Sequence, residues 1–303
     1  DPLWSRGLGD VYKRQLAGTG VAIVTPFLEN GDIDVASLEK LVNHMVQGGV
    51  DYIVALGTTG ENPTLNKEER QQVYSLVNQF NKGRISLVAG IGGNDTRSVV
   101  KSMNEFDLTG YSAILSVSPY YNKPNNEGLF QHYKAINDNA PLPVIMYNVP
   151  GRTGMNVNVA TTLRIARECK NIVATKEASG NIEQIMQIIK DKPAGFEVIS
   201  GDDGITLPMM ACGAIGVISV VGNAYPKLVS DMVNLCLEEK FAAARSNHEK
   251  MLPLISSMFA EGNPSGVKAY LSELGITKNT FRLPVVGISD ALMQSIQSLM
   301  KTI

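Results

Sequence analysis

Eight short apolar runs recur along the chain, and each is followed by a longer amphipathic stretch. Each run is only four or five residues long, is rich in β-branched residues and ends near Gly, Pro, Ser, Thr or Asn, which favours buried strands over helices. The predicted strands are residues 21–25, 52–56, 86–89, 113–117, 144–147, 172–175, 196–199 and 216–220. This alternation constrains the fold more than any other feature of the sequence.

The stretches between the runs have helical periodicity. Leu38, Leu41 and Met45 fall on one face of the first predicted helix. Asn66 followed by Glu69 has the spacing of a capping box and predicts where the second helix begins. Eight strand–helix units in succession predict an α/β fold, a (β/α)8 TIM barrel with a C-terminal helical extension.

An open, doubly wound sheet is the alternative architecture. It calls for a glycine-rich phosphate-binding turn after the first strand, but that strand runs into Pro26 and Phe27. The glycines at 90, 92 and 93 follow the third strand and lack the required spacing. The closed barrel is therefore the preferred prediction.

The chain is divided by its pattern into three parts. Residues 1–15 fit no element and are expected to be a non-native or disordered leader. Residues 16–224 form the predicted barrel. Residues 225–303 lack strands and are expected to be a helical extension packed on the barrel, with helices at 227–239, 241–259, 264–274 and 290–301.

The charge balance narrows the class of ligand. The 303 residues carry a formal net charge of −2, which provides no field to hold a nucleic acid or an anionic membrane. No segment reaches the length of apolar residues expected of a membrane span. The three cysteines and three histidines are scattered, so we expect a reduced, cytoplasmic protein with no metal site, acting on a small molecule.

Polar residues gather at the carboxyl ends of the predicted strands, where barrel enzymes build their active sites. They are the segments 57–61 (GTTGE), 118–121 (SPYY), 147–154 (YNVPGRTG), 176–178 (KEA) and 201–203 (GDD). Hydroxyl, phenol, guanidinium and ammonium groups are therefore expected on one rim.

Lys176 is the leading candidate for a catalytic residue. Ile172, Ala174 and Lys176 alternate along the sixth strand, so the ammonium should point into the barrel mouth. Burial there would lower its pKa and produce a neutral amine able to attack a carbonyl. The alternative is a structural ion pair with Glu177 or Asp202, although Glu177 should point the opposite way.

Three neighbours on the rim have candidate roles beside Lys176. Tyr147 could relay protons through its phenol, or it could be a core tyrosine bonded to a backbone carbonyl. Thr58 and Thr59 could bind a carboxylate, or they could only form a turn. Arg152 suits bidentate binding of a second carboxylate, or it could form a surface salt bridge. Together they indicate an imine-forming enzyme acting on a small α-keto acid.

At these residues the sequence resembles the dihydrodipicolinate synthase family of pyruvate-dependent class I aldolases and lyases. The resemblance extends from about Gly18 to the C-terminus. Segments 57–61 and 172–176 are signals of the whole superfamily. Segment 147–154 is more specific, because the sialic acid lyases of the superfamily lack an arginine at the position of Arg152.

The resemblance implies a role for each site residue. Lys176 would form an imine with pyruvate, so no cofactor is expected, and Thr58 and Thr59 would hold the pyruvate carboxylate. Tyr147, Thr58 and Tyr121 would form a hydroxyl relay, with Tyr121 donated across a subunit contact. Arg152 would bind the carboxylate of L-aspartate 4-semialdehyde. Backbone groups of Gly201 and Ile218 would line the pocket of a homotetrameric enzyme of diaminopimelate and lysine synthesis.

One region departs from the family pattern. Members inhibited by lysine often carry two histidines at the start of the second helix and a glutamate after the third strand. Lys67, Arg70 and Ser98 stand at these positions, while Asn94 and Tyr120 match an allosteric site. Two cations facing a cationic effector would repel it, so we expect weak or absent inhibition by lysine.

Two competing hypotheses remain. A retro-aldolase or dehydratase acting on a sugar-derived keto acid would also trap pyruvate on Lys176, and turnover of L-aspartate 4-semialdehyde separates it from a synthase. A non-catalytic barrel that only binds a keto acid has no need of Lys176, Tyr147 and the threonines together. Failure to form any adduct with pyruvate would favour that reading.

Overall fold

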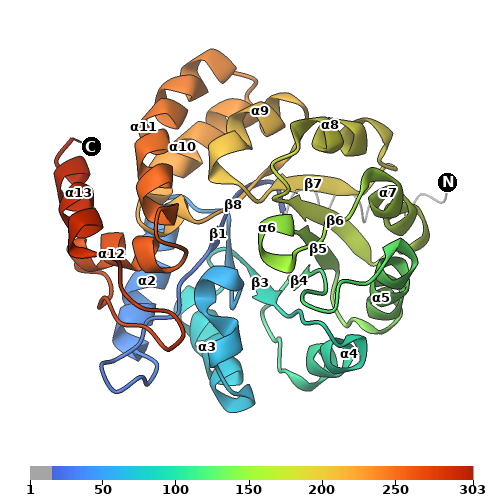
Figure 1. Ribbon diagram of the computed structural model, residues 1–303, viewed down its shortest axis with the longest axis horizontal. Coiled ribbons are helices and arrows are strands. Elements are labelled where there is room, and N and C mark those ends of the chain that lie inside the picture. The colour runs from blue at the N-terminus through green and yellow to red at the C-terminus, as the bar shows by residue number, and fades with distance from the viewer. Residues whose placement is uncertain (1–15, 303) are drawn as a thin grey trace.

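A closed barrel of eight parallel strands forms the centre of the protein (Figure 1). The computed structural model describes residues 16–302, so the leader expected at residues 1–15 lies outside the described residues. The strands follow one another around the barrel in chain order, which confirms the predicted TIM barrel. They are β1 (Gly18–Ala22), β2 (Tyr52–Ala55), β3 (Ser86–Gly90), β4 (Ala113–Val117), β5 (Val144–Asn148), β6 (Ile172–Glu177), β7 (Glu197–Ser200) and β8 (Gly216–Ser219).

A ring of helices surrounds the barrel. Asn66 accepts from the Glu69 amide at 2.9 Å and the Glu69 carboxylate accepts from the Asn66 amide at 2.9 Å, which confirms the predicted capping box. The ring consists of α2 (Val35–Gln47), α3 (Lys67–Asn81), α4 (Thr96–Glu105), α5 (Asn126–Asn139), α7 (Val159–Glu168), α8 (Ile182–Asp191), α9 (Thr206–Ala211) and α10 (Pro226–Leu237).

Two layers of apolar side chains hold the fold together, because successive residues of a strand point to opposite faces. Val54, Leu115 and Ile145 belong to a cluster inside the barrel. Ile53 and Ile114 belong to the larger cluster between the strands and the helices. The interior is thus filled with side chains. A substrate can therefore bind only at the carboxyl ends of the strands.

Strands β1 and β6 differ most from the prediction, and β7 is shifted by one residue. β1 begins at Gly18, three residues before the predicted start, because it opens with glycines that lack an apolar signal. A β-carbon at Gly20 would lie 2.2 Å from the Tyr52 ring, so the close approach of β1 and β2 requires glycine there. In β6 a register shift opposite Val144 and Ile145 turns Ile172 towards the helices, so the predicted inward position of Ile172 was wrong.

Three further helices follow the ring. They are α11 (Phe241–Phe259), α12 (Ser265–Glu273) and α13 (Asp290–Met300), within one residue of the predicted ends. α12 and α13 lie to one side of the barrel (Figure 1). The expected boundary at residue 225 stays a prediction, and the packing of α10 against β1 and β8 favours counting that helix with the ring. Within residues 16–302 no helix combines the length and apolar character needed to cross a membrane.

Candidate active site

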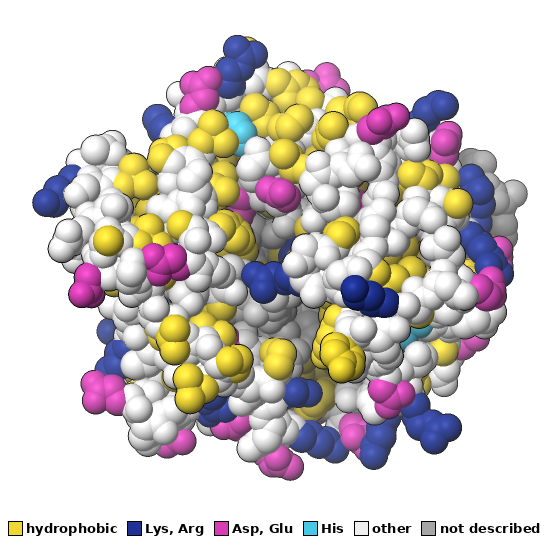
Figure 2. Space-filling view, in the orientation of Figure 1, with side chains coloured by type: hydrophobic (Ala, Val, Ile, Leu, Met, Phe, Trp, Pro, Cys, Tyr) yellow, Lys and Arg dark blue, Asp and Glu magenta, His cyan; other side chains and the backbone are white. Residues whose placement is uncertain are grey.

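The loops at the carboxyl ends of the strands surround a hollow at the centre of one face (Figure 2). Dark-blue basic side chains lie around this hollow. Three short elements follow the strands there: the 3-10 turn η1 (Thr58–Gly60) after β2, α6 (Pro150–Thr153) after β5, and the 3-10 turn η3 (Asp203–Ile205) after β7. The first two carry Thr58, Thr59 and Arg152, while Lys176 and Tyr147 lie on the strands β6 and β5 themselves.

Lys176 lies near the end of β6 and is buried, with only 5% of its surface exposed. Burial lowers the pKa of its ammonium to about 7, an effect that the negative charge of Asp203 opposes and the positive charge of Arg152 reinforces. A large fraction of the side chain is therefore a neutral amine near neutral pH. A neutral, positioned amine is the form that attacks a carbonyl carbon.

No carboxylate forms an ion pair with Lys176 among residues 16–302. The Glu177 carboxylate points away and accepts hydrogen bonds from Asn148 at 2.7 Å and from the Ser179 hydroxyl at 2.6 Å. Asp202 accepts from the Gly204 amide at 2.9 Å. Neither residue neutralises Lys176, so the structural alternative of an ion pair with Glu177 or Asp202 does not hold.

Tyr147 is the strand neighbour of Lys176. The two residues are paired in the register of β5 and β6, and the Lys176 Nζ lies 4.2 Å from the centroid of the Tyr147 ring. Burial raises the pKa of the phenol to about 12, while the nearby Arg152 charge and a hydrogen bond with the Thr58 side chain lower it. The phenol is therefore neutral near pH 7, able to donate its proton and to accept a hydrogen bond.

The threonine pair lies on η1, directly after β2. Thr59 is buried, and its hydroxyl accepts a hydrogen bond from the Asn263 side chain at 3.0 Å. Thr58 is half-buried, and its side chain is a hydrogen-bond partner of Tyr147. The two hydroxyls therefore have different partners. Thr58 is hydrogen-bonded to Tyr147, beside Lys176, and Thr59 is hydrogen-bonded to Asn263, just before α12.

Arg152 lies on α6 with its guanidinium exposed. Within residues 16–302 its hydrogen bond goes to the backbone oxygen of Asn263 at 3.4 Å, and no salt bridge involves it. Its charge nevertheless influences the pKa of both Lys176 and Tyr147, so it lies near them. An exposed guanidinium without a carboxylate partner beside a reactive amine is suited to bind an acidic substrate.

Gly201 directly follows β7, and Ile218 lies on β8. A β-carbon at Gly201 would lie 2.9 Å from the Lys176 Cε, so a glycine is needed to leave room for the lysine side chain. The Gly201 amide donates to the Glu177 oxygen at 2.7 Å. Ile218 is buried inside the barrel.

Asp203 lies in the GDD segment but was not among the site residues predicted from the sequence. Its buried carboxylate accepts hydrogen bonds from the Ser219 hydroxyl at 2.5 Å and from the backbone amides of Val220 and Val221 at 2.9 and 3.2 Å. Burial raises the pKa of Asp203, and those hydrogen bonds oppose that effect. Asp203 is the nearby acidic group whose charge raises the pKa of Lys176. Its position at the end of β7 was the available signal.

Tyr121 does not reach Lys176 within this chain. It is 89% exposed and has a left-handed backbone, with φ of 70°. Tyr120 is also exposed, and its backbone oxygen accepts from the Asn94 side chain at 3.2 Å. The relay role expected of Tyr121 therefore depends on a second subunit.

The residues at the expected allosteric positions lie on the surface around α3 and α4. Lys67 forms an exposed salt bridge with Glu105 at 2.9 Å. Arg70 is half-buried, and its Nε has no hydrogen-bond partner within residues 16–302. The Ser98 hydroxyl donates to Asp95 at the start of α4. Among the described residues there is no cluster of His, Cys, Asp and Glu arranged to hold a metal ion.

A desolvated lysine at the end of the sixth strand, with a neutral tyrosine beside it at the mouth of a (β/α)8 barrel, defines a lyase of the class I, Schiff-base-forming aldolase type. Comparison with family models narrows this class. The chain belongs to the dihydrodipicolinate synthetase family, whose model matches residues 15–303.

Individual relatives agree with this assignment. The chain is 52% identical over 286 residues to the 4-hydroxy-tetrahydrodipicolinate synthase of Parabacteroides distasonis, covering 94% of this chain and 96% of the relative. It is 51% identical over 276 residues to the same enzyme of Phocaeicola vulgatus, covering 91% and 93%. The crystal structure of dihydrodipicolinate synthase from Aquifex aeolicus has a TM-score of 0.92 and 40% identity, covering 95% of this chain and 98% of that one.

Proposed function

We propose that the protein is a 4-hydroxy-tetrahydrodipicolinate synthase, which condenses pyruvate with L-aspartate 4-semialdehyde in the synthesis of diaminopimelate and lysine. The observation that carries the proposal is the buried Lys176, with a pKa of about 7 and no carboxylate paired with it within residues 16–302. Membership of the family and whole-chain similarity to synthases of that name support it.

The first half of the reaction uses Lys176 and its hydroxyl neighbours. The neutral amine attacks the pyruvate ketone, and loss of one water forms the imine. Tyr147 donates the proton that the departing hydroxyl needs and then recovers one, with Thr58 as its hydrogen-bonded partner. The Thr58–Thr59 turn binds the pyruvate carboxylate through its hydroxyl and amide groups. Because the substrate itself forms the covalent link, the reaction requires no cofactor.

The second half brings in the aldehyde. Loss of a proton from the pyruvate methyl converts the imine to an enamine, whose carbon attacks the aldehyde carbon. Arg152 binds the carboxylate of the aldehyde substrate and thereby orients it. The amine of that substrate then attacks the imine carbon, closes the ring and releases Lys176 as a free amine. The water released when the imine formed is the other product, and the Lys176 side chain returns to its starting state.

The assembly and location of the enzyme are also proposals. We propose a homotetramer in the cytoplasm in which Tyr121 of one subunit completes the hydroxyl relay of another. The exposure of Tyr121 in the single chain supports this arrangement, because a large aromatic side chain that is 89% exposed is available to a partner surface.

Turnover tests the proposed function. The wild-type protein should consume pyruvate only when L-aspartate 4-semialdehyde is added, and Lys176→Ala should abolish turnover. A protein that consumes sugar-derived keto acids but not this aldehyde would be an aldolase or dehydratase of the same superfamily. Near-normal turnover in Lys176→Ala would contradict both.

A further inference from the structure

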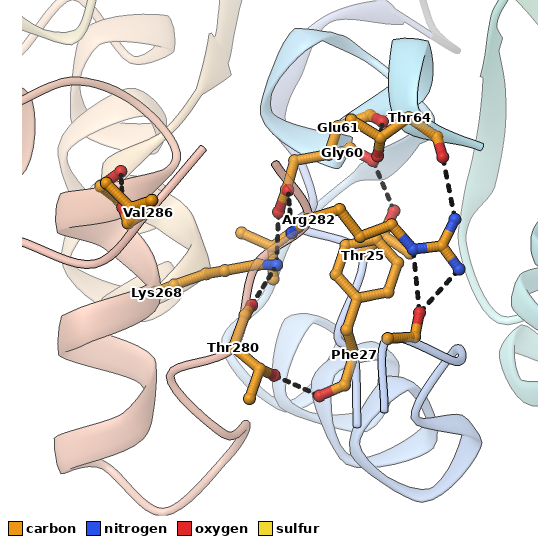
Figure 3. Close-up of polar contacts among 12 residues, drawn as sticks. Thr25, Phe27, Gly60, Glu61, Thr64, Lys268, Thr280, Arg282 and Val286 are labelled. Carbon is orange, nitrogen blue, oxygen red and sulfur yellow. Dashed lines mark hydrogen bonds and ion pairs between the residues drawn. The ribbon is translucent and has the colours of Figure 1, made fainter. Parts of the chain in front are cut away.

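A buried ion pair links the C-terminal helices to the loop that carries the threonine pair (Figure 3). The Lys268 side chain on α12 is completely buried, and its ammonium contacts the Glu61 carboxylate, whose side chain is 1% exposed. Lys268 also donates to the Thr280 backbone oxygen at 2.9 Å and lies 4.5 Å from the Phe27 ring centroid. Burying two charges together is costly, so this pair must be fully partnered to persist.

Glu61 has a conformation that depends on such partners. It follows η1 directly and has a left-handed backbone, with φ of 52°, which costs a non-glycine residue about 1–2 kcal/mol. Its amide donates to the Thr58 oxygen at 3.3 Å, which closes the turn that holds both threonines. The second oxygen of its carboxylate accepts from the Arg282 amide at 3.3 Å. The ion pair therefore fixes the residue that closes the threonine turn.

The same C-terminal segment contacts the site at two more points. The Asn263 side chain donates to the Thr59 hydroxyl, and the Asn263 backbone oxygen accepts from Arg152. Asn263 and Lys268 are separated by only four residues across the start of α12. The two candidate carboxylate receptors, Thr59 and Arg152, are thus both joined to one short stretch of the C-terminal region.

We propose that Glu61 and Lys268 are positioning residues, whose ion pair holds the Thr58–Thr59 turn in the geometry that binds the carboxylate of the keto-acid substrate. Neither residue needs to touch the substrate, since both act through the backbone of the turn. The proposal rests on the proposed role of Thr58 and Thr59. It assigns to the C-terminal helices a direct part in building the active site.

The test uses Lys268→Met and, as a matched control, Lys192→Met. Lys192 also pairs with a buried carboxylate, that of Glu197 at 2.9 Å, but it lies at the opposite end of β7 from the site. In Lys268→Met the pyruvate concentration giving half-maximal borohydride trapping should rise about tenfold, because a small displacement of a binding group has large kinetic effects. Lys192→Met should leave that concentration unchanged.

Hydrogen exchange provides a readout independent of substrate. Lys268→Met should speed exchange of the amides in residues 57–64 while leaving residues 172–177 protected as in the wild type. If Lys268→Met does not fold, the charge-neutral double variant Glu61→Gln/Lys268→Met replaces it. Half-saturation by pyruvate and hydrogen exchange are then measured on the double variant. Unchanged half-saturation and unchanged exchange at residues 57–64 in either variant would overturn the proposal.

The proposed function and the positioning role of the ion pair would be contradicted by different results. A wild-type protein that forms no pyruvate adduct contradicts the proposed function, whatever the exchange experiment shows. A wild-type protein that traps pyruvate normally, together with variants that keep wild-type exchange and half-saturation, contradicts only the positioning role of Glu61 and Lys268.

Discussion

Lys176 and Tyr147 are paired in register on neighbouring strands, with the lysine nitrogen 4.2 Å from the centroid of the tyrosine ring. An aromatic face favours a cation, yet burial dominates and lowers the pKa of Lys176 to about 7. The pair therefore combines a nucleophile with a large neutral fraction near pH 7 and a proton donor that remains protonated there.

Imine formation should follow the titration of Lys176. Below pH 7 most of the Lys176 amine is protonated and cannot attack a carbonyl. The rate at which an adduct forms that borohydride can trap should therefore rise through about pH 7 and level off above it. An unperturbed lysine has a pKa of 10.5, and its rate would keep rising well beyond pH 9. Rapid-quench trapping from pH 5.5 to 10 distinguishes the two, and a midpoint above 9 would contradict the burial argument.

Tyr147→Phe should preserve the ring beside Lys176 but remove the phenol. Imine formation should slow by about 10²–10⁴-fold, because proton transfer by a positioned group contributes on that scale. The midpoint of the pH profile should stay near that of the wild type, since burial of Lys176 is unchanged. Stopped-flow kinetics of adduct formation measures both quantities. If the variant forms the imine at the wild-type rate, Tyr147 only packs in the barrel core and takes no part in proton transfer.

Arg152→Gln should weaken binding of the aldehyde substrate without preventing binding of pyruvate. The KM for L-aspartate 4-semialdehyde should rise about tenfold or more, because a charge-assisted carboxylate contact of about 1.5–3 kcal/mol is lost. Trapping of pyruvate on Lys176 should persist. Arg245→Gln on the exposed face of α11 is the control and should leave both KM values unchanged. An equal rise in both KM values would indicate a general disturbance of the site.

Lysine should inhibit weakly or not at all. The resemblance to the family aligns Lys67 and Arg70 with histidines of its lysine-sensitive members, and the two positive charges would repel a cationic effector. Titration of the purified enzyme with L-lysine, at matched ionic strength with sodium chloride as the control, measures this directly. Strong inhibition by submillimolar lysine would show that Asn94 and Tyr120 suffice to form the effector site.

The barrel was predictable because its strands alternate with helices at a spacing that few other folds share. The position of β1 was not, since it opens with Gly18 and Gly20, which contribute no apolar signal and are required by close contacts with Asp51 and Tyr52. The inward orientation of Ala174 and Lys176 was confirmed, but a register shift in β6 reversed the orientation of Ile172. Periodicity predicts an uninterrupted strand and cannot reveal such a shift.

The central residues of the site were recognisable because strand ends meet at one rim. Contacts made by the C-terminal region were not, because Asn263 and Lys268 lie about 200 residues from the turn that they contact. The sequence does not distinguish a buried lysine in a helix from an exposed one. Only the folded structure shows that Lys268 is enclosed between Glu61 and the Phe27 ring.

The most direct test of the central claim is mass spectrometry of the protein after borohydride reduction in the presence of pyruvate. We expect one adduct per chain, with the mass of pyruvate less one water plus two hydrogens, on the peptide that contains Lys176. Addition of L-aspartate 4-semialdehyde before reduction should diminish that adduct by turnover. Absence of the adduct, or its appearance on another lysine with Lys176 unmodified, would contradict the account.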